Sequence, residues 1–162
     1  MRKKYAYVEE KPKSKYFDLM KLLGINSPEE EFLALTSLEV SYKVINDLPN
    51  EIGDLVNLRV LYLNDNKISS IPPDIGKLSN LIHLDLSFNC LKSIPKEIGN
   101  LKNLRKLILN GNKITELPEE IGSITELKLL SLHNNQLTDI PITLIKLTCL
   151  VEFYLVLFLS CI

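Results

Sequence analysis

The chain has 162 residues, of which 46% are hydrophobic and 24% are charged, the balance of a single globular domain. Its formal net charge of −1 argues against the positive field that draws proteins onto nucleic acid, so we expect no nucleic-acid partner. The three cysteines have neither paired nor metal-ligand spacing, which argues against a disulfide framework and favours reduced thiols in a cytoplasmic or nuclear protein.

Residues 1–31 are predicted to form a basic tail and a helical cap. Six of the first fifteen residues are Lys or Arg, which we interpret as a solvated tail; contact with acidic lipid or RNA, or nuclear import, is the alternative. No apolar stretch typical of a secretory signal follows Met1. The spacing of apolar residues predicts a helix near 15–23 that ends at Gly24. An amphipathic helix that binds a partner is the alternative role for this segment.

A second helix is predicted near 28–36. Ser27 is the expected N-cap, Pro28 follows in the first turn, and Glu30 has the spacing that completes a capping box with Ser27. Together the two helices are expected to cover the first edge of a leucine-rich stack, since such stacks need polar caps.

A repeat of 23 residues begins at Phe32 and is clearest from Leu55 onward. The repeated unit has apolar residues, an asparagine and a glycine at fixed positions, and a proline that follows Leu or Ile. Lys43 replaces the asparagine in the first unit, Ile145 replaces the glycine in the fifth, and Phe158 replaces the asparagine in the sixth. The full units are predicted at 32–54, 55–77, 78–100, 101–123 and 124–146, and a partial sixth begins at 147.

Each repeated position has a physical role. The alternating leucines predict a short strand, and stacked units predict a parallel sheet. The proline suits the first turn of a short helical segment, and the glycine suits its C-terminal end. A buried asparagine amide can serve as both donor and acceptor where the strand bends away. The predicted asparagine ladder consists of Asn66, Asn89, Asn112 and Asn135.

These features predict one fold, a cooperative α/β solenoid. Its concave face is expected to be a parallel β-sheet, and its convex face is expected to carry short helical or 3-10 segments. The solenoid spans 32–157, and 158–162 is predicted to be a hydrophobic irregular end. The stretch from Phe153 is uncharged and too short to span a membrane, so we expect no transmembrane segment. We interpret it as an interruption of the natural repeat run, or as an edge that a partner covers.

The sequence offers little for catalysis. His83 and His133 are predicted on strand positions of the open face, where no Cys or second His joins them as a metal ligand. No serine or cysteine has a nucleophile motif, and most glycines recur at one fixed position of the repeat rather than as a phosphate-binding loop. We therefore expect no enzyme activity, no cofactor, no metal and no small-molecule substrate.

The concave face is the candidate binding site. Its centre mixes aromatic, aliphatic and charged side chains, which is typical of a protein contact surface. The alternative is that these are ordinary surface residues of strands. The proposed partner-binding residues are Arg59, Tyr62, His83, Asp85, Phe88, Arg105, Lys106 and Ile108.

The repeated pattern of leucines, asparagine, Ile-Pro and Ile-Gly resembles the leucine-rich-repeat family. Its style is similar to the intracellular repeats of LAP-type scaffolds and plant intracellular Ras-group proteins. The resemblance covers about 32–157 and implies a curved α/β horseshoe with a concave binding face. It also implies a signalling scaffold that engages Ras-like small GTPases or a signalling enzyme.

The leading hypothesis is thus an intracellular, non-catalytic adaptor that binds a protein partner. A second hypothesis is the recognition region of a larger enzyme, for example a deadenylase-type nuclease, a cyclase, a kinase or a phosphatase. In that case the repeats recruit a partner and the chemistry lies outside these residues. The third is a non-functional fragment.

Overall fold

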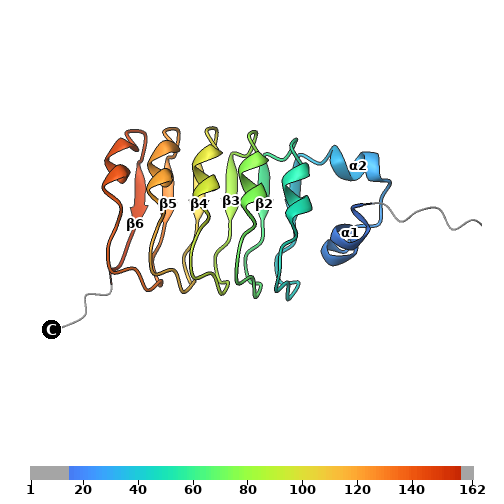
Figure 1. Ribbon diagram of the computed structural model, residues 1–162, viewed down its shortest axis with the longest axis horizontal. Coiled ribbons are helices and arrows are strands. Elements are labelled where there is room, and N and C mark those ends of the chain that lie inside the picture. The colour runs from blue at the N-terminus through green and yellow to red at the C-terminus, as the bar shows by residue number, and fades with distance from the viewer. Residues whose placement is uncertain (1–14, 158–162) are drawn as a thin grey trace, which may run out of the picture.

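A computed structural model describes residues 15–157. Within them, six short strands form one parallel sheet in chain order, which confirms the predicted solenoid (Figure 1). Each strand pairs with the next at a shift of 23 residues, so that Leu61 lies beside Leu84 and Leu84 beside Leu107. The strands are β1 (Ser37–Glu39), β2 (Val60–Tyr62), β3 (His83–Asp85), β4 (Lys106–Ile108), β5 (Leu129–Ser131) and β6 (Glu152–Tyr154).

Short 3-10 turns alternate with the strands and stack in a second row along the solenoid (Figure 1). Each turn contributes one buried isoleucine to the core in the first four coils, for example Ile75 and Ile98. The single core therefore lies between the sheet and these turns. The turns are η1 (Asn50–Asp54), η2 (Pro73–Lys77), η3 (Lys96–Asn100), η4 (Glu119–Ser123) and η5 (Ile142–Lys146).

The prediction that the repeated proline lies in the first turn is wrong by one position. Pro95, for example, is the N-cap of η3 and has extended backbone angles, φ −67° and ψ 146°. A proline suits this place because its fixed φ is compatible with the extended conformation that precedes the turn. The other repeated prolines occupy the same position.

The repeated glycine lies near the C-terminal end of the turn, as predicted, but it does not cap the turn. Gly99 is the fourth residue of η3 and not its C-cap, and its φ is not positive. A Cβ atom on Gly99 would lie 2.5 Å from the carbonyl oxygen of Glu120 in the next coil. Because such a contact is much shorter than van der Waals distance, glycine is required for the close stacking of neighbouring turns.

The asparagine ladder joins each coil to the one before it. The Nδ2 group of Asn112 donates to the carbonyl oxygens of Leu86 (2.9 Å) and Leu109 (3.0 Å), and its Oδ1 accepts from the backbone N–H of Leu91 (3.0 Å). Asn66, Asn89 and Asn135 make equivalent bonds. The side chains thus satisfy buried backbone groups at the corner where the strand ladder stops.

Two helices, α1 (Phe17–Leu23) and α2 (Glu29–Leu33), lie at the N-terminal end of the stack (Figure 1). Leu19, Leu23 and Phe32 are buried in the same core as the coils. Gly24 ends α1 in a left-handed conformation, as predicted. The predicted capping box is wrong, because Pro28 is the N-cap of α2 and no side chain caps this helix.

The cap is tied to the first coil by Asp54 of η1. Its carboxylate accepts hydrogen bonds from Lys15 Nζ (2.6 Å) and from the hydroxyl group of Tyr16 (3.3 Å). The Lys15 ammonium group lowers the pKa of Asp54, chiefly through this hydrogen bond. The rest of the predicted basic tail, 1–14, and the predicted hydrophobic end, 158–162, lie outside the described residues.

The C-terminal side of the stack has an exposed apolar edge within the described residues. Phe153 of β6 is 41% exposed, although Leu130 at the same position of β5 is fully buried. Ile145 occupies the position of the stacking glycine in η5 and is 78% exposed. An identical turn could not stack against η5 in the same way, because the side chain of Ile145 fills the space that the glycines leave free.

Candidate binding surface on the concave face

The outward-facing side chains of the strands form the candidate binding surface. The first and third residues of each strand point away from the core, while the central leucine is buried between them in β1 to β5. We call this outward side, with the residues that directly flank the strands, the concave surface. One row across it consists of Ser37, Val60, His83, Lys106, Leu129 and Glu152, and the next of Glu39, Tyr62, Asp85, Ile108, Ser131 and Tyr154.

The structure brings most of the proposed contact residues together. Asp85 lies directly between Tyr62 and Ile108 in the sheet, and His83 lies beside Lys106. Arg59 and Arg105 directly precede β2 and β4, and Phe88 lies at the corner that follows β3. All eight residues are partly or fully accessible and thus available to a partner.

His83 is the most constrained member of this group. Its ring meets the ring of Tyr62 edge-on, with the ring centroids 4.9 Å apart. Its Nε2 atom is buried and has no hydrogen-bond partner among residues 15–157. Burial lowers the pKa of His83; Lys106 adds to the shift, and Asp85 opposes it. The imidazole is therefore neutral at physiological pH.

Asp85 is held in one orientation by Ser87. Its Oδ1 accepts from the backbone N–H of Ser87 (2.9 Å) and from the Ser87 hydroxyl group (2.6 Å). A carboxylate fixed in this way presents its charge to a partner with little loss of side-chain entropy on binding.

A polar row at the edge of this surface, in which Ser87 and Asn110 are buried, was missed from the sequence. Ser41 donates to Asn64 (2.7 Å), and Ser131 donates to Asn110 (3.3 Å) and lies 3.1 Å from Nδ1 of His133. The signal was available, because the position two residues before each ladder asparagine, or before Lys43 in the first unit, is polar. The members of this row are Ser41, Asn64, Ser87, Asn110 and His133. His133 therefore does not lie on a strand as predicted, but two residues beyond the end of β5.

Phe88 has an unusual backbone conformation. Its φ is +52°, in the left-handed region, where a bulky side chain is strained. The equivalent residues of the other coils, Tyr42, Asp65, Gly111 and Asn134, also have positive φ. Asp65, Gly111 and Asn134 are residue types that tolerate it, whereas Tyr42 and Phe88 are both bulky aromatic residues. Phe88 is nevertheless 53% exposed. Strained residues that expose an aromatic ring are candidates for function.

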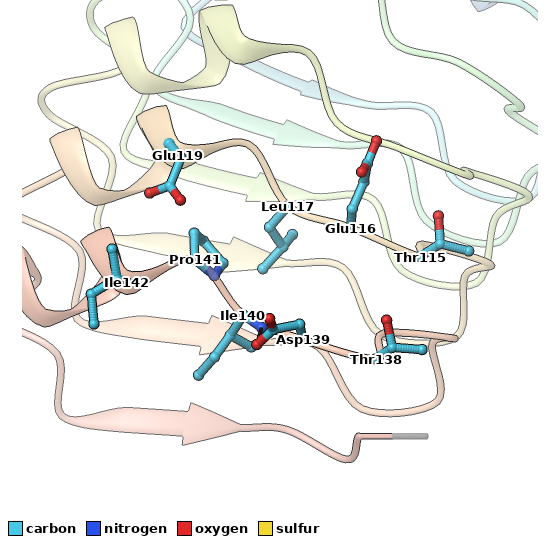
Figure 2. A pocket seen from close by; sticks show the side chains of 9 residues that line it. All are labelled: Thr115, Glu116, Leu117, Glu119, Thr138, Asp139, Ile140, Pro141 and Ile142. Atoms are coloured by element: carbon cyan, nitrogen blue, oxygen red, sulfur yellow. Dashed lines mark hydrogen bonds between the residues drawn. The ribbon is translucent and has the colours of Figure 1, made fainter. Parts of the chain in front are cut away.

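One cavity borders the concave surface and another lies away from it. One of about 210 Å³ lies at the start of the strands, between Arg59 and Arg105. Another, of about 610 Å³, lies between the fourth and fifth coils, away from the concave surface, and is lined by Glu116, Glu119 and Asp139 among others. Figure 2 shows that these three carboxylates stand at separate parts of the wall and do not converge. Within residues 15–157 no group of three or more His, Cys, Asp or Glu residues could hold a metal ion.

The repeat geometry agrees with a family model. Residues 56–114 and 102–156 match the model described as "Leucine rich repeat", which together covers more than half of the chain. The chain belongs to the leucine-rich-repeat family. Repeat domains of this family are generally protein-binding modules and are typically non-catalytic, and the matching family is not a catalytic one.

Solved structures of other leucine-rich-repeat proteins are similar to this chain. A Leptospira interrogans leucine-rich-repeat protein is 34% identical, with a TM-score of 0.62 over 80% of this chain and 41% of its own. The plant peptide hormone receptor RGFR1, solved in complex with RGF2, is 34% identical, with a TM-score of 0.68 over 74% of this chain and 20% of its own. The PEPR1–AtPEP1 structure is 31% identical, with a TM-score of 0.72 over 80% of this chain and 19% of its own.

This leucine-rich-repeat chain thus spans less than half the length of these three structures. Because they include a plant receptor, the likeness does not single out the intracellular style of repeat. No curated protein sequence matches the chain. No helix within residues 15–157 is long and apolar enough to cross a membrane.

Proposed function

We propose that this leucine-rich-repeat chain is a non-catalytic adaptor inside the cell that binds a segment of a partner protein on its concave surface. The observation that carries the proposal is the exposed ring of Phe88, held in a strained conformation at the edge of a surface that also presents Tyr62 and Ile108. Aromatic and aliphatic anchors among charged residues are the usual composition of a binding hot spot.

The comparisons support the binding role in general terms. RGFR1 was solved in complex with RGF2, so a repeat protein similar to this chain binds a peptide. A parallel sheet with an open face offers rows of side chains along which an extended peptide segment can lie.

The cytoplasm or the nucleus is the proposed location. Cys90 is half-buried and Cys149 is exposed, and both are free thiols, which suits a reducing compartment. The likeness of the repeat style to Ras-group proteins supports a place in small-GTPase signalling.

The recognition region of a larger protein is the second candidate. The observation that favours it is the greater length of the similar Leptospira protein, of which this chain covers only 41%. A nuclease, cyclase, kinase or phosphatase domain would then supply chemistry that the repeats lack.

The test compares protein capture by two double variants of the tagged chain. Tyr62→Ala with Ile108→Ala removes two anchors from the concave surface, while Val56→Ala with Ile142→Ala removes exposed apolar side chains elsewhere. Bound proteins are quantified by mass spectrometry after capture from the cells in which the chain is expressed. We expect the first variant to lose a specific partner that the second retains, with unchanged circular dichroism for both. Equal capture by the two variants would place the binding site elsewhere.

A further inference from the structure

The start of the strands brings two arginines to one hollow. Arg59, Ile82 and Arg105 stack in successive coils, because the N–H of Ile82 donates to Arg59 and the N–H of Arg105 donates to Ile82, both at 2.8 Å. Twice the strand spacing of about 4.8 Å puts the two arginine backbones about 9.6 Å apart, with only Ile82 between them. The cavity of about 210 Å³ between them is lined by Arg59, Ile82, Arg105, Asn80 and Asn103.

The two guanidinium groups have no partner of their own in the described chain. Neither forms an ion pair or a side-chain hydrogen bond with any residue of 15–157. Lysines on the other side of the solenoid are paired instead, Lys15 with Asp54 and Lys77 with Asp74. The charge around the hollow is therefore available to a ligand.

The choice of residue type is also specific. The chain has three arginines among its 19 basic residues, and two of the three line this cavity. Arginine presents planar N–H groups that match a carboxylate in a bidentate way, whereas lysine acts as a point charge. The two asparagines are held in place, because Nδ2 of Asn80 donates to Val56 (2.9 Å) and Nδ2 of Asn103 donates to Ser79 (2.8 Å).

Charge is distributed unevenly over the concave surface. Lys106 and Lys128 extend the positive charge along the start of β4 and β5. Most acidic residues of this surface, Glu39, Asp85 and Asp65, lie instead at or beyond the strand ends. The next coil does not repeat the hollow, since Glu126 stands where Asn80 and Asn103 stand in the earlier coils.

We propose that Arg59 and Arg105 form a carboxylate-binding subsite of the concave surface, so that the segment the chain binds carries an acidic group at this place. The proposal rests on the proposed function and deepens it, because it names the chemistry of the partner. The carboxylate comes either from the C-terminus of the partner or from an Asp or Glu side chain. A subsite at one edge of the surface also fixes the direction in which an extended segment lies across the coils.

The test follows the two guanidinium groups directly by NMR. The Nε–Hε signals of Arg59 and Arg105 are assigned with the variants Arg59→Gln and Arg105→Gln, and Arg2 serves as an internal reference. Three short peptides are titrated into the full chain: a neutral peptide with a free C-terminal carboxylate, an amidated peptide with one internal Glu, and the amidated neutral peptide.

We expect the Nε–Hε signals of Arg59 and Arg105 to shift together, with one dissociation constant, when either peptide that carries a carboxylate is added. The amidated neutral peptide should shift neither signal. The tighter binder of the two identifies the source of the carboxylate. Arg59→Gln should raise the dissociation constant measured at the Arg105 signal at least fivefold, because both arginines bind the same carboxylate. Shifts that do not saturate, or that are the same for all three peptides, would overturn the proposal.

Partner capture separates this proposal from the proposed function. Arg59→Gln with Arg105→Gln is compared with Lys67→Gln with Lys113→Gln, which removes the same charge from exposed lysines outside the concave surface. We expect only the arginine variant to lose the partner. If it keeps a partner that Tyr62→Ala with Ile108→Ala loses, the subsite is wrong and the proposed function stands.

Discussion

The ring of Phe88 packs directly against Gly111 of the next coil. A Cβ atom on Gly111 would lie 2.7 Å from Cδ1 of Phe88, so only glycine leaves room for the ring in this position. Both residues have positive φ, +52° for Phe88 and +70° for Gly111. The ring is therefore held at one place on the concave surface, although the backbone that carries it is strained.

Phe88→Asn should separate binding from stability. Asparagine tolerates the left-handed conformation, as Asn134 does at the equivalent position two coils later. We expect the free energy of unfolding in urea to stay equal or to rise by up to about 1 kcal/mol, while capture of the partner weakens. Weaker capture with a large loss of stability would instead make Phe88 a structural residue.

Asn112→Ala should destabilise the solenoid strongly. The amide of Asn112 satisfies three backbone groups, those of Leu86, Leu91 and Leu109, and these would stay buried without partners. We expect a loss of about 3 kcal/mol or more, since each unsatisfied buried group costs about 1–3 kcal/mol. Asn80→Ala is the control in urea unfolding and should cost less than about 1 kcal/mol, because its hydrogen bond to Val56 is exposed. Equal losses would rule out burial as the reason for the ladder.

Gly99→Ala tests the close stacking of the 3-10 turns. The added methyl group would lie 2.5 Å from the carbonyl oxygen and 2.8 Å from Cβ of Glu120, so that η3 and η4 must move apart. We expect a loss of about 2 kcal/mol or more in urea unfolding, in the range of overpacked sites. Ile145→Ala changes the same position in η5, where the side chain is exposed, and should shift stability by about 0.5 kcal/mol at most. A stable Gly99→Ala protein would contradict this account of the glycine.

His83 should make stability depend on pH. Its pKa is lowered in the folded chain, mainly by burial, so protonation favours the unfolded state. The contribution is therefore fully present above the ordinary histidine pKa of about 6.5 and is lost as the pH falls below it. His83→Gln should lose less stability than the parent chain between about pH 7.5 and pH 5.5 in urea unfolding. The same loss in both proteins would show that His83 is not the group responsible.

The solenoid could be predicted from the sequence because the residues that define its strands recur at a fixed interval. Leu61, Leu84 and Leu107 recur every 23 residues, so one strand assignment fixes the register of the whole sheet. The neighbours Tyr62, Asp85 and Ile108 on the concave surface followed from the same count.

Features that depend on contact between coils could not be predicted in this way. The role of Gly99 depends on the distance to Glu120, 21 residues later, which a search for local helix signals does not include. The hollow between Arg59 and Arg105 requires side-chain volumes around Ile82. The orphaned Nε2 atom of His83 depends on how the Tyr62 ring and its other neighbours bury it.

The most direct test of the central claim is site-specific photo-crosslinking in cells. A benzophenone amino acid replaces either Tyr62 on the concave surface or the exposed Lys96 of η3, and crosslinked proteins are identified after irradiation. We predict a specific protein crosslinked from position 62 and none from position 96. A partner crosslinked from position 96 alone would show that the chain binds through the other side of the solenoid.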